Sequence, residues 1–196
     1  MMRTVCIAAA VVTCVANAHA ETKGQWIEIG TRIHGGFGIL IPIGIRIGLD
    51  AKEWLRPEPR QLAVTYYTGE RAPCPCIADG IMIATGASPG QGTLRIEPEK
   101  APAGLFAMVV VRNRKTGEAL RYTVPTELGP KIVEWNRTLD PAGRYDAAMS
   151  VDGLFQVMPD RLAVSSRPVY IRKAPGDARG FLVAGVRRSG QCQLNR

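Results

Sequence analysis

The sequence predicts an α+β protein, because strand-like and helix-like segments follow one another along its central part. Residues 62–68 are rich in β-branched and aromatic side chains, which favours a strand. Residues 76–85 are apolar and end at Gly86, a pattern typical of a helix. Three further strands are predicted at 93–96, 106–112 and 120–124. The polar segment between the last two is typical of a hairpin turn.

The segment before the first strand is ambiguous from its own pattern. Glycines at 38, 44 and 48 repeat at helical spacing, and Pro42 fits only the first turn of a helix. The isoleucines and leucines between 39 and 49 also alternate with period two, which favours a strand. Periodicity alone leaves both alternatives open for residues 39–52. Towards the end of the chain, helices are predicted at 131–139 and 144–157 and short strands at 168–171 and 181–186.

The first twenty residues have the pattern of a secretory signal peptide. Arg3 supplies a positive start, Val5–Val15 an apolar core, and Ala18-His-Ala20 a small-x-small cleavage site. The apolar run is too short to span a bilayer, so no transmembrane anchor is expected after cleavage. We therefore expect a periplasmic or secreted protein. Removing 20 of the 196 residues leaves 176, with His34 as the only histidine.

Cysteine usage and charge narrow the function classes further. Cleavage leaves Cys74, Cys76 and Cys192, which suits one disulfide and one free thiol rather than a disulfide-rich scaffold. The net charge falls from +8 to +7 with the loss of Arg3. No basic stripe interleaved with aromatic residues accompanies this charge, so no nucleic-acid partner is expected.

Two segments carry most of the chemical information. His34 precedes the apolar run at 39–52, and Cys76 opens the predicted helix at 76–85. A fold that brings them together would offer a nitrogen and a sulfur ligand to a metal ion, or a reactive thiolate. Cys76 lies at the predicted start of a helix, where free N–H groups and the helix dipole stabilise negative charge and therefore favour a thiolate.

These segments resemble the family of the formylmethanofuran dehydrogenase E-subunit. The family pattern begins with a His-Gly pair before a glycine-spaced helix, as do His34-Gly35 and the helix residues Gly44, Arg46 and Gly48. A Cys-x-x-Asp-x-Ile block and a Thr-Gly turn follow, as in Cys76-Ile-Ala-Asp79-Gly-Ile81 and Thr85-Gly86…Gly90…Leu94. Leu154-Phe155 resembles a late signature of the family.

The resemblance implies a fold and a division of the chain. It favours a helix at 39–52 and the order helix, strand, helix and three strands in a mixed sheet, similar to the catalytic domain of glyceraldehyde-phosphate dehydrogenases. Residues 1–20 are then the signal peptide and 21–160 the α+β domain that resembles the family. Residues 161–196 are expected to form a C-terminal extension packed on that domain. A homodimer is a further expectation, because a glycine-spaced apolar helix can pack on its copy.

The family's site is incomplete in this sequence. Where the family has a second histidine and further cysteines, this chain has Gly36, Gly38 and Ala87, and Gln91 replaces a lysine. What the resemblance retains of the ligand set is His34 and Cys76, with Asp79. A closed structural zinc site needs four ligands.

Three interpretations of Cys76 stay open at this point. In the first, His34 and Cys76 bind zinc or, less favoured, copper, with Asp79 or Cys74 completing the shell. In the second, Cys76 is a catalytic nucleophile activated by His34. In the third, Cys76 forms a disulfide with Cys192. A disulfide within Cys74-Pro-Cys76 would close a strained, readily reduced ring.

The glycine-rich segment after the second helix is a candidate ligand loop. Thr85, Gly86, Gly90 and Gln91 are the residues expected to bind there, through backbone N–H groups. A plain helix-ending turn is the favoured alternative. Taken together, the sequence favours an exported carrier or accessory protein that binds a metal ion or small cofactor between the His34 and Cys76 segments. An enzyme using Cys76 and a structural protein with a vestigial site are the alternatives.

Overall fold

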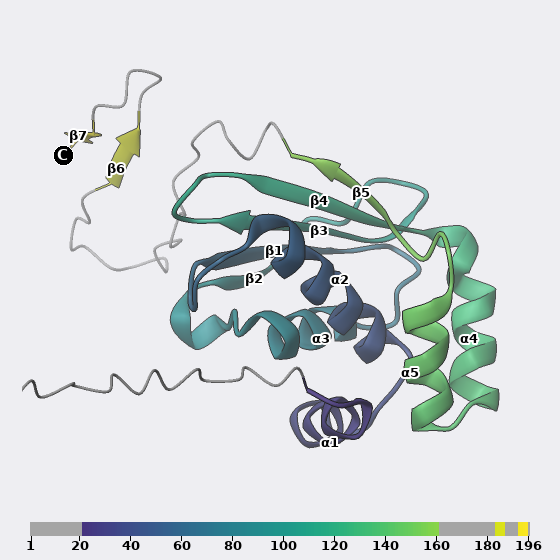
Figure 1. Ribbon diagram of the computed structural model, residues 1–196. Helices are drawn as coiled ribbons and strands as arrows, with labels where there is room; N and C mark the ends of the chain where they lie inside the picture. The colour runs from purple at the N-terminus through teal and green to yellow at the C-terminus, as the bar shows by residue number, and fades with distance from the viewer. Residues whose placement is uncertain (1–20, 161–182, 187–191, 196) are drawn as a thin grey trace, which may run out of the picture.

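A five-stranded sheet with helices α2 and α3 against one face forms the centre of the molecule (Figure 1). The computed structural model describes residues 21–160 and the strands 183–186 and 192–195. The helices are α1 Lys23–His34, α2 Leu40–Leu55, α3 Cys76–Thr85, α4 Gly129–Thr138 and α5 Pro141–Ser150, with 3-10 turns η1 Pro89–Gln91 and η2 Thr126–Leu128. The strands are β1 Leu62–Thr68, β2 Leu94–Glu97, β3 Leu105–Asn113, β4 Ala119–Pro125, β5 Gln156–Pro159, β6 Val183–Val186 and β7 Cys192–Asn195.

The main sheet is mixed and has the order β2-β1-β3-β4-β5. β1 pairs parallel with β2, and the other neighbours are antiparallel. Burial alternates along β1, so that Leu62, Val64 and Tyr66 face the helices and their neighbours are half-buried. β6 and β7 form a separate antiparallel pair. The predicted mixed α+β fold is confirmed, and the similarity to glyceraldehyde-phosphate dehydrogenases stays a prediction.

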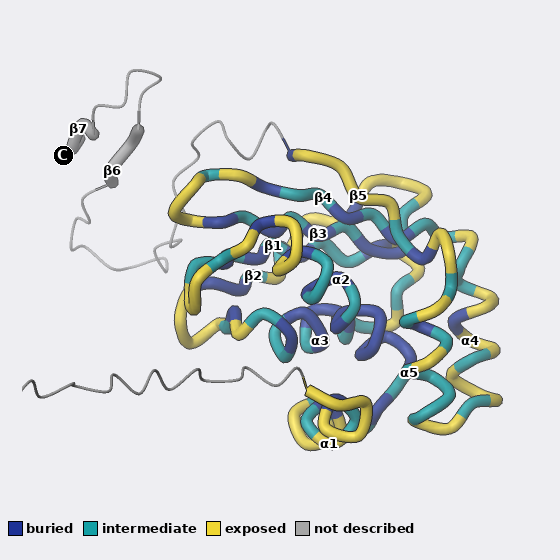
Figure 2. Tube along the Cα trace, in the orientation of Figure 1, coloured by how far each residue is buried: buried dark blue, intermediate teal, exposed yellow. Residues whose placement is uncertain are grey.

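Over residues 40–49, helix α2 is buried almost all round, which explains the ambiguous sequence pattern of this segment. Ile43 and Ile47 pack in the core cluster between the helices and the sheet. Ile41 and Ile45 pack in a second cluster with Trp26 of α1. Because opposite sides of one helix are both covered, apolar residues appear at nearly every position and the helical period is lost (Figure 2). The resemblance settled correctly what periodicity left open.

Helices α2 and α3 cross with their backbones in contact. A Cβ atom added at Gly44 would collide with the carbonyl oxygen of Ile77, and one added at Gly80 would collide with that of Ile41. A Cβ at Gly48 would meet the side chain of Ala84 at 2.7 Å. The glycine spacing therefore serves packing inside this chain. The same glycine-spaced face cannot also pack against a second copy of the chain. The homodimer stays a prediction, and the glycine spacing does not support it.

The last helix of the domain, α5, is tied to α2 by an arginine. Arg46 donates hydrogen bonds through Nη1 to the carbonyl oxygens of Ala148 and Val151, at 2.8 and 2.7 Å. Its guanidinium lies 5.4 Å from the ring centre of Phe155. These carbonyls at the end of α5 have no partner within the helix, so the arginine satisfies them. This gives a structural role to Arg46 and Phe155, both of which match the family pattern.

Several predicted boundaries need correction. α1 was not predicted, although Thr22 and Gln25 form a capping box at its start. The helix predicted at 144–157 is wrong in extent, since α5 starts at Pro141, where Asp140 caps it, and ends at Ser150. The strand β5 follows. The predicted strand 181–186 corresponds to β6, whereas 168–171 and most of the C-terminal extension lie outside the described residues. In the described part of the chain, no helix is long and apolar enough to cross a membrane.

Candidate functional site

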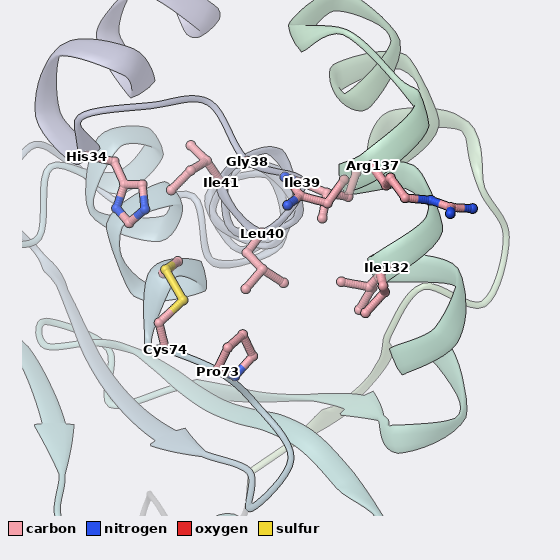
Figure 3. Close-up of a pocket in the computed structure, with 12 residues that line it drawn as sticks. His34, Gly38, Ile39, Leu40, Ile41, Pro73, Cys74, Ile132 and Arg137 are labelled. Atoms are coloured by element: carbon pink, nitrogen blue, oxygen red, sulfur yellow. Dashed lines mark hydrogen bonds between the residues drawn. A yellow bond between two sulfur atoms is a disulfide. The ribbon is translucent and has the colours of Figure 1, made fainter.

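His34 and Cys76 line one pocket of the structure. The pocket has a volume of about 400 Å³ and is open to solvent. His34 and the two cysteines lie at one end, and Ile132 and Arg137 of α4 lie at the other (Figure 3). Its lining consists of His34, Gly38, Ile39, Leu40, Ile41, Pro73, Cys74, Cys76, Ile132, Val133, Asn136 and Arg137.

One helix end and two helix starts place the residues of the pocket. α1 ends at His34 because Gly35 adopts a left-handed conformation, with φ 83°, and its backbone N–H donates a hydrogen bond to the carbonyl oxygen of Thr31. α3 begins at Cys76 immediately after Pro75, with no side-chain hydrogen bond capping it. Leu40 and Ile41, at the start of α2, form part of the pocket wall.

The imidazole of His34 is oriented by a carboxylate. Its Nδ1 lies 2.7 Å from Oδ2 of Asp79, a residue in the first turn of α3. An ionised carboxylate only accepts hydrogen bonds, so Nδ1 carries the proton and donates it. The neutral tautomer then has its lone pair on Nε2, the atom through which histidine binds a metal or accepts a hydrogen bond. The structure thus places Asp79 behind His34 and bonded to it.

The two neighbouring cysteines are joined in a disulfide. Cys74 and Cys76 are bonded to each other, and both side chains are half-buried at the pocket wall. The interpretation that Cys76 pairs with Cys192 is therefore wrong. Proximity is the physical reason, because a partner two residues away is already close before the chain folds. In this state Cys76 has no thiolate, and neither sulfur is available as a thiolate ligand.

The donor set does not fit a zinc ion while the disulfide is present. Zinc takes thiolate, imidazole and carboxylate ligands, usually four of them. In the described part of the chain, no group of three or more histidine, cysteine, aspartate or glutamate side chains is placed to hold a metal ion. His34 remains as one strong ligand.

The candidate ligand loop lies at the other end of α3. Thr85 is the last residue of that ten-residue helix and Gly86 caps it, whereas Gly90 and Gln91 belong to the turn η1. None of the four lines the pocket. Thr85 Oγ1 donates to the carbonyl of Ile81 at 2.7 Å, and the Gln91 amide donates to that of Gly86 at 3.2 Å. These contacts are those of a turn that ends a helix.

Sequence reasoning missed the wall supplied by α4. Ile132 is buried, whereas Val133 is 67% exposed and forms part of the pocket's edge. The guanidinium of Arg137 extends away from the cavity, so only its stem lines it (Figure 3). Asn136 accepts a hydrogen bond from the backbone N–H of Ile39 at 3.3 Å. The sequence predicted the helix but offered no signal for which helix it would face.

Fold and site together define an α+β domain with a small, mainly apolar pocket whose wall carries a disulfide and an oriented histidine. The comparison with protein families agrees with the resemblance. Residues 33–153 match the model of the FmdE family, described as molybdenum formylmethanofuran dehydrogenase operon, and the chain belongs to this family. No curated protein gives a match to the sequence.

Proposed function

We propose that this chain is an exported binding protein of the family, and that its pocket takes a small organic molecule or cofactor. The observation that carries the proposal is the chemistry of the pocket. Its walls are largely aliphatic, and a single oriented imidazole supplies polarity at one end. Cavities of about 300–1,000 Å³ with apolar walls and few polar groups are typical of small-molecule sites.

Export is supported by one feature of the sequence and two of the fold. The signal pattern ends at Ala20, and α1 is capped at Thr22 directly behind it, so cleavage leaves the fold's first helix complete. A disulfide also suits an oxidising compartment. Sequencing the N-terminus of the protein from the exported fraction checks this, since cleavage predicts Glu21 as the first residue. An N-terminus at Met1 in that fraction would contradict it.

Ligand binding is tested by blocking the pocket from its exposed edge. Val133→Trp fills the cavity from a position that the core does not need, and Glu134→Trp places the same side chain on the same helix outside the pocket. Native mass spectrometry of protein purified from the exported fraction measures bound small molecules. We expect an adduct on the wild type and on Glu134→Trp that is lost on Val133→Trp. Equal adducts on all three would place the ligand elsewhere.

A metal ion is the second candidate, and one observation favours it. His34, Cys74 and Cys76 line the same end of one pocket, so reduction of the disulfide would provide two thiolates beside an imidazole. Such a set suits zinc, and copper less well. Elemental analysis of oxidised and reduced protein, beside His34→Ala and Cys76→Ser, tests it. Near-stoichiometric metal only in the reduced wild type is the expected result. Metal retained in both variants would refute it.

An enzymatic function is the less favoured alternative. A nucleophilic Cys76 would need its thiolate, which the disulfide removes. The structural interpretation, with a vestigial site, predicts neither an adduct nor a metal. The two experiments above therefore also separate the structural interpretation from the proposal.

A further inference from the structure

The disulfide lies where it can react. Cys74 and Cys76 are separated by one residue, and both line an open pocket. A cross-link that closes so short a loop removes the least entropy from the unfolded chain, so it adds little as a structural staple. Its position in the pocket wall therefore calls for a chemical explanation.

The two cysteines occupy different positions relative to helix α3. Cys76 is the first residue of the ten-residue helix α3, whose start has no side-chain cap. Free backbone N–H groups and the helix dipole stabilise negative charge at such a position, which makes its sulfur the better leaving group. Cys74 precedes the helix, and its sulfur lies at the helix start only through its bond to Cys76. The acidic side chain of the first turn, Asp79, is hydrogen-bonded to His34.

We propose that Cys74–Cys76 is a redox-active disulfide that accepts two electrons from a dithiol reductant entering the pocket. One reductant thiolate attacks the sulfur of Cys74 and forms a mixed disulfide, while the bond to Cys76 breaks and Cys76 leaves as a thiolate. The second reductant thiol then displaces Cys74. The reductant becomes a disulfide, and two electrons and two protons pass to the cysteine pair.

This inference shares with the proposed function only the premise that solutes enter the pocket. The aliphatic walls from α2 and α4 would hold the carbon skeleton of the reductant beside the sulfurs. It does not depend on which molecule the pocket binds in the oxidised state, because native mass spectrometry of the oxidised protein measures that separately.

The wild-type sequence provides its own matched control. Trypsin cleaves after Arg71 and after Arg95, and the peptide 72–95 contains Cys74 and Cys76 but no other cysteine. Folded protein and the isolated oxidised peptide are equilibrated in parallel with mixtures of reduced and oxidised dithiothreitol containing a chelator. Acid quenching, alkylation and mass spectrometry of this peptide then give the reduced fraction, free of any contribution from Cys192.

The fold is expected to shift the equilibrium towards the dithiol. Half-reduction of the folded protein should need about a tenfold lower ratio of reduced to oxidised dithiothreitol than the peptide, the size of effect expected from a thiolate at a helix start. Limiting iodoacetamide should then label Cys76 several-fold more than Cys74. A folded protein reduced no more easily than the peptide, or equal labelling of the two cysteines, would overturn the proposal.

Discussion

The contact between α2 and α3 makes Gly80→Ala the sharpest test of the packing described above. The added Cβ would collide with the carbonyl oxygen of Ile41 and approach Cα of Gly44 to 2.8 Å and N of Ile45 to 2.9 Å. All three neighbours are backbone atoms of one helix, so no side chain can rotate away. The two helices must therefore move apart.

The magnitude follows from two opposing effects. Overpacking of a tight core costs about 1–3 kcal/mol. Alanine gains about 0.5–1 kcal/mol over glycine in a helix interior. Because the obstruction is rigid backbone, we expect the upper part of the packing range and a net loss of about 2 kcal/mol in the free energy of unfolding. In a chain of this size, that corresponds to a fall of roughly 4–8 °C in Tm.

Equilibrium unfolding in urea, followed by circular dichroism, measures the loss, and Gly24→Ala is the matched control. Gly24 also lies in a helix, but nothing within 4 Å of it would meet an added Cβ, so the same substitution should leave stability unchanged or slightly raised. Gly80→Ala should also weaken binding in the pocket, because Ile41 and Cys76 belong to its wall. A Gly80→Ala protein as stable as the wild type would refute the close backbone contact.

The remaining predictions concern single side chains. Arg46→Met leaves two carbonyls at the end of α5 without a donor and should cost about 1.5–3 kcal/mol in urea unfolding, whereas exposed Arg137→Met should cost little. Asp79→Ala removes the hydrogen bond that keeps the proton of His34 on Nδ1, so both neutral tautomers should become populated. ¹⁵N NMR of this histidine, the only one in the mature chain, should then report mixed Nδ1 and Nε2 protonation. An unchanged spectrum would contradict the pairing of His34 with Asp79. Burial, reinforced by a carboxylate hydrogen bond, raises the pKa of Tyr122 above its ordinary value of 10.0. The protonated phenol is thus favoured in the fold, and its stabilisation is present below pH 10 and lost as pH rises above it. The urea concentration at the midpoint of unfolding should therefore decrease as the pH is raised from 9 to 11, and it should decrease less steeply in Tyr122→Phe.

Much of the fold could be predicted because local pattern and burial agree there. β1 alternates along its length and lies in the sheet with one face on the helices, so β-branched residues and period two point the same way. α3 ends at Gly86, whose left-handed conformation is the one that glycine favours. α2 could not be predicted from periodicity, because neighbours on several sides bury it. There the glycine pattern shared with the family carried the information.

At the site, the sequence by itself determined the groups, and the tertiary structure decided their relations. A lone histidine at the end of one helix and a cysteine at the start of another were visible in the chain, as was the short Cys-Pro-Cys spacing. Which cysteine pairs with which is a matter of distances in space, as is the contact of Asp79 with His34 across 45 positions. The wall from α4 likewise depends on how helices pack, because side-chain pattern fixes which face of a helix is apolar but not which partner covers it.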